Sequence, residues 1–417
     1  MKKSMMCALS ALAGCGVLTS ALDAHAADCS TYPNPVYVAG STASKPIWAA
    51  LAQKLTGISI IYQAPSSCVG LSDVVTAVAD TKPAIFEDGS AAGIACTNPG
   101  PVTVGISDVF PSSCGSLTVP SGFKDFQGPI QAMVIAVPSG STESSISADA
   151  AYTVFGWGGT AYPVAPWTSW NDIFIRSPTS GNETMIGAAI GLASSKWLSQ
   201  VPDAGASQQE ASATAVLNAL QGAGGGANVS AAIGILSSDI GDTNRGPMGT
   251  NDAGAAVGGI KLLAFKAADQ SCGYLPDSDA THFDKINVRQ GRYDIWGPIH
   301  LLTAVDGSGN PTNAQAATLI QNLTLASSLT TDQIQTVIQS DANAYVIPQC
   351  AMQVSRSAEV SPVTGGGEAS YQPATGCGCY YESLKNGGAP YSKYCTPCGS
   401  GCAAPYPTCH FGYCEAQ

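Results

Sequence analysis

The segment 176–184 carries the residues best suited to bind an anion. It begins with Arg176, whose planar guanidinium offers two parallel donors that match an oxyanion. Small residues and further donors follow: Ser180, Gly181 and Asn182. An apolar helical pattern comes next, over 185–197, and the start of a helix offers free backbone N–H groups and the positive end of a dipole. Taken alone, the segment is more typical of an ordinary helix N-cap beside a surface arginine.

Three other segments place small polar residues where a predicted strand ends. They lie at 36–46, 62–70 and 104–110, and their candidate ligand groups are Thr42, Ala43, Ser67 and Asp108. In open α/β sheets, ligands bind at the carboxyl ends of the strands. Each segment singly is typical of a turn, but four of them in this order favour one binding site.

These four loops, in this order, resemble those of the phosphate-binding protein of the phosphate ABC transporter, a periplasmic substrate-binding protein family. The matching residues are Gly40-Ser41-Thr42, Tyr62-Gln63 with Ser66-Ser67, Gly105-Ile106-Ser107-Asp108, and Arg176 with Ser180-Gly181-Asn182. The resemblance extends over about 36–323. It implies an α/β, type 2-like fold of two lobes, a monomer that hands inorganic phosphate to an ABC permease, and no cofactor.

The resemblance also implies a site and a division of the chain. Phosphate would be bound by Thr42, Ala43, Ser67, Asp108, Arg176, Ser180, Gly181 and Asn182. Two apolar strands, 130–137 and 296–302, would cross between the lobes. The first lobe would then comprise 27–132 plus 300–361, and the second 133–299.

The chain departs from the family beside the arginine. Pro178-Thr179 stand where the family has Asp-Gly, so Arg176 lacks the carboxylate that orients it, and Glu183 is the candidate substitute. Asn182 replaces a threonine and keeps a side-chain donor. These changes leave open a receptor for another oxyanion.

Composition excludes some classes of function. The formal net charge is −12 and only 11% of residues are charged, so no basic stripe is available for nucleic acid. A single small anion needs directed donors rather than net charge. His282, His300 and His410 lie in no nucleophile or metal motif, and there is no Gly-x-Ser-x-Gly elbow, so we expect no enzyme.

The N-terminus resembles a cleaved export signal. Lysines at 2 and 3 precede an apolar stretch and the Ala24-His25-Ala26 cleavage pattern, which predicts a signal peptide over 1–26 and a periplasmic or extracellular protein. The alternative is a lipoprotein box at 12–15, which would leave a lipidated Cys15. No other run reaches the ~18 apolar residues of a membrane span.

Cysteines predict disulfides in the exported chain. Of 15 cysteines, Cys7 and Cys15 precede the cleavage site, which leaves 13, six in the body and seven after 376. Their number in an exported protein favours disulfides. Closeness in sequence suggests a Cys96–Cys114 pair. Cys395 and Cys398 with His410 offer zinc as a weaker alternative. The odd number in the tail implies a free thiol, a bridge to the body, or an intermolecular bond.

The end of the chain differs in composition from the body. A Gly/Ser-rich linker is predicted over 362–376, and a Cys-rich tail over 377–417. The tail has too few aliphatic residues for a core and needs cross-links. An alternative function is therefore a surface interaction protein, in which the lobes are a scaffold and the tail binds a surface partner.

Overall fold

The computed structural model describes residues 26–115, 117–159, 162–198, 209–226, 229–250, 256–362 and 365–415. The predicted signal peptide, apart from Ala26, lies outside these ranges, as does Cys15.

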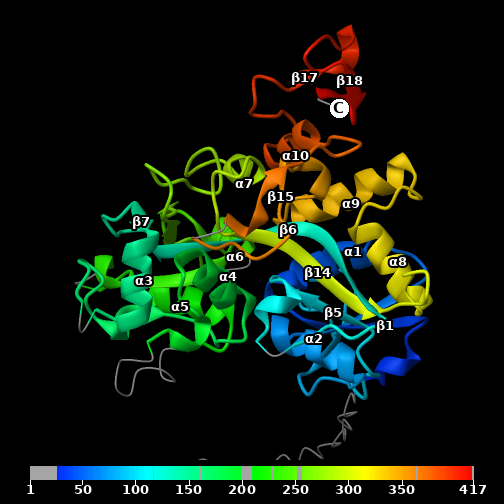
Figure 1. Cartoon of the computed structure of the whole chain (residues 1–417), viewed down its shortest axis with the longest axis horizontal. Helices are drawn as coiled ribbons and strands as arrows, with labels where there is room; N and C mark the ends of the chain where they lie inside the picture. Colours follow the sequence, from blue (N-terminus) through cyan, green and yellow to red (C-terminus); the bar gives the residue numbers. More distant parts are fainter. Residues whose placement is uncertain are drawn as a thin grey trace, which may run out of the picture.

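A mixed sheet runs through both halves of the molecule (Figure 1). Its order in the described chain is β4 (Ile94–Cys96), β3 (Ala84–Phe86), β2 (Ser59–Gln63), β1 (Pro35–Gly40), β5 (Val104–Ser107), β14 (Trp296–Ala304), β6 (Phe123–Pro138), β9 (Ile233–Ser237) and β8 (Ile173–Phe174), with β12 (Ile260–Leu262) paired to β6. β1 is parallel to β2 and β5, whereas β14 is antiparallel to β5 and β6. Parallel strands joined by helices give the α/β class that the sequence predicts.

Strands β6 and β14 join two lobes, as Figure 1 shows. The start of β6 pairs with the end of β14 beside β5, and its residues Met133 to Ala136 pair with β9. β6 is buried without interruption from Gly128 to Pro138, because it is covered on both faces where it enters the second lobe. We call β1–β5, α1, α2 and α8 the first lobe, and β8, β9, β12 and α3–α6 the second lobe. The two-lobed α/β architecture is confirmed.

Helices cover the sheet in both lobes. In the first lobe these are α1 (Lys45–Ala52), α2 (Ser67–Thr76) and α8 (Ala314–Leu323), and in the second α3 (Ala148–Trp157), α4 (Gly181–Ile190), α5 (Ala213–Ala223) and α6 (Ser238–Asn244). The outer elements are α7 (Ile286–Arg289), α9 (Thr331–Asn343), and the strand pairs β7 (Ser145–Ser147) with β13 (Ala264–Lys266) and β10 (Gly249–Thr250) with β11 (Ala256–Val257). Each lobe has its own apolar cluster.

The helix after Arg176 is earlier and shorter than the pattern 185–197 predicts. It begins at Gly181 and ends at Ile190, where Gly191 takes a left-handed conformation with φ of +73°. Glycine adopts that conformation without strain and ends helices in this way.

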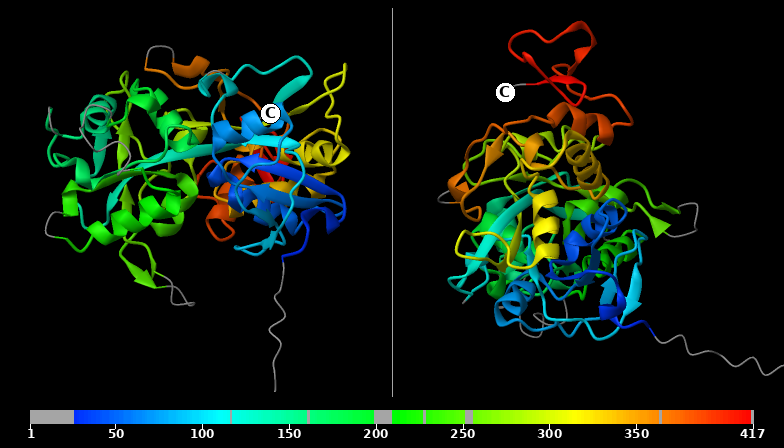
Figure 2. Two further views of the ribbon diagram at one scale, coloured as in Figure 1. Left: turned by 90° about the horizontal axis from the view of Figure 1, so that it is seen from below. Right: turned by 90° about the vertical axis from the view of Figure 1, so that its right-hand side faces the viewer.

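The Cys-rich tail forms a small unit that projects from one side of the body (Figures 1 and 2). It contains α10 (Gly378–Lys385) and a sheet of β17 (Thr396–Pro397), β19 (Tyr413–Glu415) and β18 (Thr408–His410). The range assigned to a linker includes β16 (Ala369–Ser370), which pairs with β15 (Val354–Ser355). α10 packs on α9, and Lys385 Nζ donates to the carbonyl of Ala342 at 2.8 Å.

Six disulfides are present among the described residues, which confirms that the cysteines cross-link the chain. They are Cys29–Cys96, Cys68–Cys114, Cys350–Cys377, Cys379–Cys395, Cys398–Cys409 and Cys402–Cys414. The predicted Cys96–Cys114 pair is wrong. Cys96 lies in β4 at the edge of the sheet, four strands from β5, and it bonds the N-terminal Cys29 instead.

The tail's odd cysteine is used in a bridge to the body, Cys350–Cys377, and the free thiol is Cys272 in the body. The sulfurs of Cys398, Cys402 and Cys414 lie within 4.8 Å of one another, but all three belong to disulfides and offer no thiolate for zinc. In the part of the chain that the structure describes, no helix has the length and apolar character needed to cross a membrane.

Candidate functional site between the lobes

The first lobe contributes three strand ends that converge on Asp108. Ser41, directly after β1, donates its hydroxyl to Asp108 Oδ2. Ser67, the first residue of α2, places its Oγ 3.3 Å from the same oxygen. Tyr62, from β2, donates its hydroxyl to the carbonyl of Ser41 and so fixes the first loop. The parallel pairing of β1 with β2 and β5 brings these carboxyl ends together.

Asp108 is almost fully buried, with 1% of its surface exposed. Burial raises the pKa of its carboxyl to about 6, and the hydrogen bonds from Ser41 and Ser67 partly oppose this rise. Oδ2 accepts both hydrogen bonds. Oδ1 is buried and accepts none from the described residues, so one carboxyl oxygen has no hydrogen-bond partner within the described protein.

The second lobe contributes the N-terminus of α4. Ser180 is the N-cap residue, and its Oγ accepts a hydrogen bond from the backbone N–H of Glu183 at 3.3 Å. Gly181 and Asn182 form the first turn, where backbone N–H groups have no partner within the helix. Arg176 precedes this turn and is 3% exposed, so it is not the surface residue that the alternative reading requires.

Gly181 brings the two half-sites into contact. A Cβ atom at position 181 would lie 2.4 Å from Asp108 Oδ2 and 2.6 Å from Ser67 Oγ, closer than atoms pack. Only glycine allows the first turn of α4 to approach the carboxylate this closely. A second contact between the lobes joins Ser66 Oγ to Thr179 Oγ1 at 3.3 Å.

We compared the chain with known proteins. No family model matches it, and no curated protein matches it. Among solved structures, it is similar to a putative phosphate ABC transporter substrate-binding protein with bound phosphate from Clostridium perfringens (13% identity, 76% of this chain and 99% of that chain, TM-score 0.46). It is also similar to an ABC-type phosphate transport receptor from Vibrio cholerae (12% identity, 76% and 100%, TM-score 0.44) and to an OxyR mutant from Corynebacterium glutamicum (9% identity, 75% and 67%, TM-score 0.38). At these scores we draw no functional conclusion from the likeness.

Unpartnered polar atoms gather on the second lobe's side of the site. Among the described residues, Arg176 Nε and Asn182 Nδ2 are buried and make no hydrogen bond. Buried donors without partners are rare and costly, by about 1–3 kcal/mol each. The two donors belong to the first turn of α4 and to the residue five positions before it, where a helix N-terminus favours an anion.

Glu183 does not replace the carboxylate that the family places beside its arginine. Its Oε2 accepts a hydrogen bond from the backbone N–H of Arg176 at 3.0 Å, rather than from the guanidinium. Burial raises the pKa of Glu183 to about 9, against the effects of that hydrogen bond and of the arginine's charge. Glu183 is therefore neutral at pH 7. The guanidinium is held instead by Nη1, which donates to the carbonyl of Glu210.

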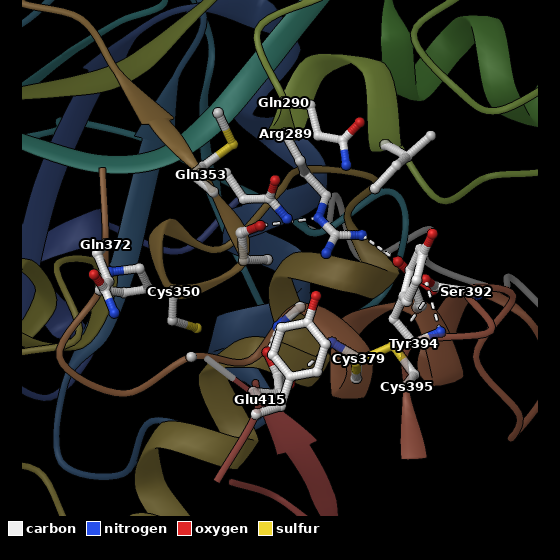
Figure 3. Close-up of a pocket in the computed structure, with 18 of the residues that line it drawn as sticks. Arg289, Gln290, Cys350, Gln353, Gln372, Cys379, Ser392, Tyr394, Cys395 and Glu415 are labelled. Atoms are coloured by element: carbon white, nitrogen blue, oxygen red, sulfur yellow. Dashed lines mark hydrogen bonds and ion pairs between the residues drawn. A yellow bond between two sulfur atoms is a disulfide. The ribbon is translucent and has the colours of Figure 1, made fainter. Parts of the chain in front are cut away.

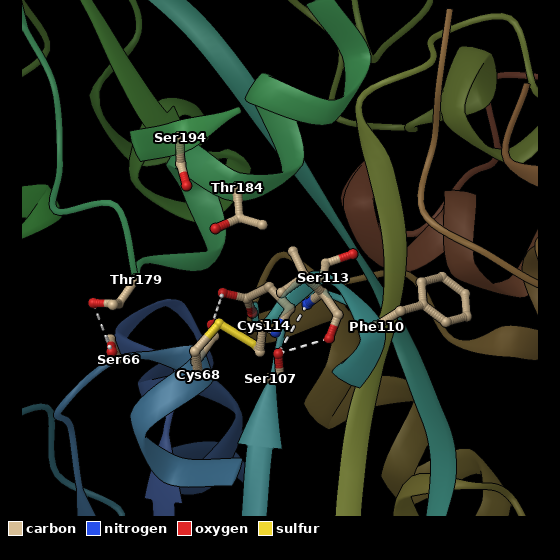
Figure 4. Close-up of a disulfide and its surroundings, with 12 residues drawn as sticks. Ser66, Cys68, Ser107, Phe110, Ser113, Cys114, Thr179, Thr184 and Ser194 are labelled. Atoms are coloured by element: carbon tan, nitrogen blue, oxygen red, sulfur yellow. Dashed lines mark hydrogen bonds between the residues drawn. A yellow bond between two sulfur atoms is a disulfide. The ribbon is translucent and has the colours of Figure 1, made fainter. Parts of the chain in front are cut away.

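The disulfide Cys68–Cys114 lies near Ser66 and Ser107, which adjoin the residues of the first half-site (Figure 4). Cys68 follows Ser67 in α2, and Cys114 ends the short turn that follows Asp108. Glu359 holds the same turn from another direction, because its Oε2 accepts from the backbone N–H of Phe110 at 3.2 Å. The two loops that contact each other through Ser67 and Asp108 are thus also joined covalently.

The structure brings most of the expected site residues together. Ser67, Asp108 and Gly181 are in mutual contact, and Ser180, Asn182 and Arg176 lie in or beside the same turn. Thr42 and Ala43 follow Ser41 in the first loop, and the backbone N–H of Ala43 donates to Ser41 Oγ at 3.1 Å. Ser41, not Thr42, contacts Asp108. Ser41 was not among the predicted ligand residues, although it belongs to the same Gly-Ser-Thr loop.

Proposed function

We propose that this protein binds inorganic phosphate between its two lobes and delivers it to an ABC permease from outside the cytoplasm. The observation that carries the proposal is the contact of Gly181 with Asp108 and Ser67, since it places a helix N-terminus of one lobe on a buried carboxyl of the other. The lobe limits 27–132 plus 300–361 and 133–299 are part of this proposal.

The chemistry of the two half-sites suits phosphate better than a fully ionised anion. Arg176, Asn182, Ser180 and the first N–H groups of α4 supply donors for the charged oxygens. A carboxyl facing an anion is unfavourable unless it accepts a hydrogen bond from the ligand. Asp108 Oδ1 can accept from a phosphate O–H, which sulfate lacks at neutral pH.

Binding across the lobes couples capture to closure. A ligand that contacts both half-sites favours the closed arrangement over an open one by its differential affinity for the two. The two crossing strands β6 and β14 are the connections about which the lobes would rotate.

Two measurements on the mature protein test this proposal. Isothermal titration should give one phosphate per chain, and X-ray scattering should show a smaller radius of gyration when phosphate is saturating. An absence of phosphate binding would reject the function. Stoichiometric binding with an unchanged radius would reject closure alone.

The six disulfides are those of a protein that folds outside the reducing cytoplasm. Cleavage after Ala26, or lipidation of Cys15, is the proposed route of export. We propose no catalytic residue, metal or cofactor for this site.

A further inference from the structure

A pocket lies where the Cys-rich tail meets the body (Figure 3). Its volume is about 380 Å³, within the range of roughly 300–1,000 Å³ usual for small-molecule sites. One wall comes from the body, at α7 and around Cys350. The other comes from the tail, at α10 and β19. This pocket is separate from the interlobe site, because none of its lining residues belongs to the four anion-binding loops.

The charged groups of this pocket are satisfied within the protein. Arg289 Nη1 donates to Glu382 Oε1 at 2.7 Å, and its Nε donates to the carbonyl of Ala351 at 2.9 Å. Glu382 Oε2 accepts from the backbone N–H of Ser392 at 2.9 Å. Glu415 accepts from the first two N–H groups of α10, at 2.8 and 2.9 Å. All three charged side chains thus make hydrogen bonds within the protein.

The neutral polar groups of the pocket are available. They belong to three amide and three phenol side chains: Gln290, Gln353, Gln372, Tyr371, Tyr394 and Tyr406. Gln290 Oε1 is buried and has no hydrogen-bond partner among the described residues. An amide both donates and accepts, and a phenol ring offers an apolar face beside a polar tip.

This combination matches the chemistry of a sugar ring. A pyranose has an apolar C–H face that packs on an aromatic ring, and hydroxyls that each donate and accept a hydrogen bond. An amide can donate a hydrogen bond to one hydroxyl and accept one from another. Charged side chains whose hydrogen bonds are made inside the protein leave these hydroxyls to the neutral groups. A peptide would instead require unpaired backbone groups, but Gln353 and Tyr371 are already joined through their backbones at 2.9 Å.

The pocket is also held in shape before any ligand arrives. Cys350–Cys377 ties the start of the tail to the body, and Glu415 anchors β19 onto α10. Preorganisation of this kind lowers the cost of binding. We propose that the pocket between the tail and the body is a binding site for a neutral saccharide, so that the tail makes the protein a glycan-binding as well as an anion-binding molecule.

The test uses the full mature chain with its disulfides formed. Binding to an array of neutral and charged glycans identifies the class of glycan that the protein prefers. Titration with maltotriose, cellotriose and triacetylchitotriose, each beside the cationic chitotriose and the anionic trigalacturonate, gives the affinities. We expect neutral glycans to bind and the charged ones to bind at least about tenfold more weakly.

Two substitutions locate the site. Tyr406→Ala and Gln353→Ala should each weaken binding of the best neutral trisaccharide by about tenfold. Tyr162→Ala, which removes an equally large ring that is 61% exposed on the second lobe, should leave it unchanged. Gln353 is exposed, so its substitution preserves the fold. The proposal is overturned if no neutral glycan binds, if charged glycans or a neutral tripeptide such as Ala-Ala-Ala bind better, or if both variants bind as the parent does. Phosphate titration of the same samples keeps this outcome separate from the interlobe site.

Discussion

The interlobe site and the tail pocket differ in whether their charged groups have hydrogen-bond partners within the protein. Between the lobes, Arg176 Nε, Asn182 Nδ2 and Asp108 Oδ1 are buried and unpartnered. In the tail pocket, Arg289, Glu382 and Glu415 make their hydrogen bonds inside the protein, and amides and phenols remain available. At the interlobe site, the unpartnered guanidinium and carboxyl atoms favour an ionic ligand. In the tail pocket, charged groups with hydrogen bonds made inside the protein, surrounded by free neutral groups, favour a neutral ligand.

The largest expected effect concerns the interlobe arginine. Arg176→Ala should weaken phosphate binding by about 2–5 kcal/mol, roughly 30-fold or more, because a buried charge-assisted contact is lost. Arg292→Ala removes an exposed arginine and is the matched control. Titration of both variants checks this. Saccharide binding by Arg176→Ala should equal that of the parent. If Arg176→Ala binds phosphate within threefold of the parent, Arg176 belongs to no anion site.

Each region has its own disulfide, and removing each one separately tests whether the two sites are independent. Cys68–Cys114 and Cys350–Cys377 join residues 46 and 27 positions apart, so each double-serine variant should lose about 2–4 kcal/mol of stability. Cys68→Ser/Cys114→Ser should also weaken phosphate binding by about 1 kcal/mol, since Ser67 and Asp108 lose their covalent link.

Cys350→Ser/Cys377→Ser should weaken saccharide binding and leave phosphate binding unchanged. Denaturant unfolding and the two titrations measure these effects. Equal loss of both ligands in either variant would mean that the two sites are not independent.

A smaller effect is expected at Gly181. Gly181→Ala adds a Cβ that overlaps Asp108 Oδ2 and Ser67 Oγ, so phosphate binding should weaken by about 1–3 kcal/mol through overpacking. Gly222→Ala, whose Cβ would meet no atom within 4 Å, should have no effect on phosphate binding. Titration and scattering together would show whether closure is lost. Normal closure in Gly181→Ala would contradict the contact between the lobes.

The last effect concerns the stability of the fold and its dependence on pH. Glu183 keeps its proton when folded up to a pKa of about 9, whereas unfolded glutamate loses it near 4.5. Unfolding between these values releases a proton, so rising pH destabilises the folded protein by up to about 1.4 kcal/mol per pH unit from this group. Buried Asp108 and Asp239 act in the same direction. Glu183→Gln should flatten the decline between about pH 5 and 8, as measured by denaturant unfolding. An identical decline in both proteins would show that Glu183 is ionised.

The sequence predicted the parts that depend on the order of strands. Loops that follow the parallel strands β1, β2 and β5 must meet at one edge, and Ser41, Ser67 and Asp108 do meet. Disulfide pairing could not be predicted, since Cys96 and Cys114 are close in the chain, but Cys96 lies in β4 and Cys114 follows β5, four strands away in the sheet. Glu183 was an unsuitable substitute partner because helix geometry directs its carboxyl to a backbone N–H. The tail pocket exists only because the tail packs on the body, and no local sequence pattern predicts that packing.

The most direct test of the central claim is a competition titration of phosphate and sulfate on the parent and on Asp108→Asn. The parent should bind phosphate and be unaffected by a large excess of sulfate, because two acceptors would face each other at Asp108. The variant's amide can donate, so sulfate should compete with phosphate in Asp108→Asn. If the parent binds sulfate as well as it binds phosphate, both the role of Asp108 and the proposed phosphate function are contradicted.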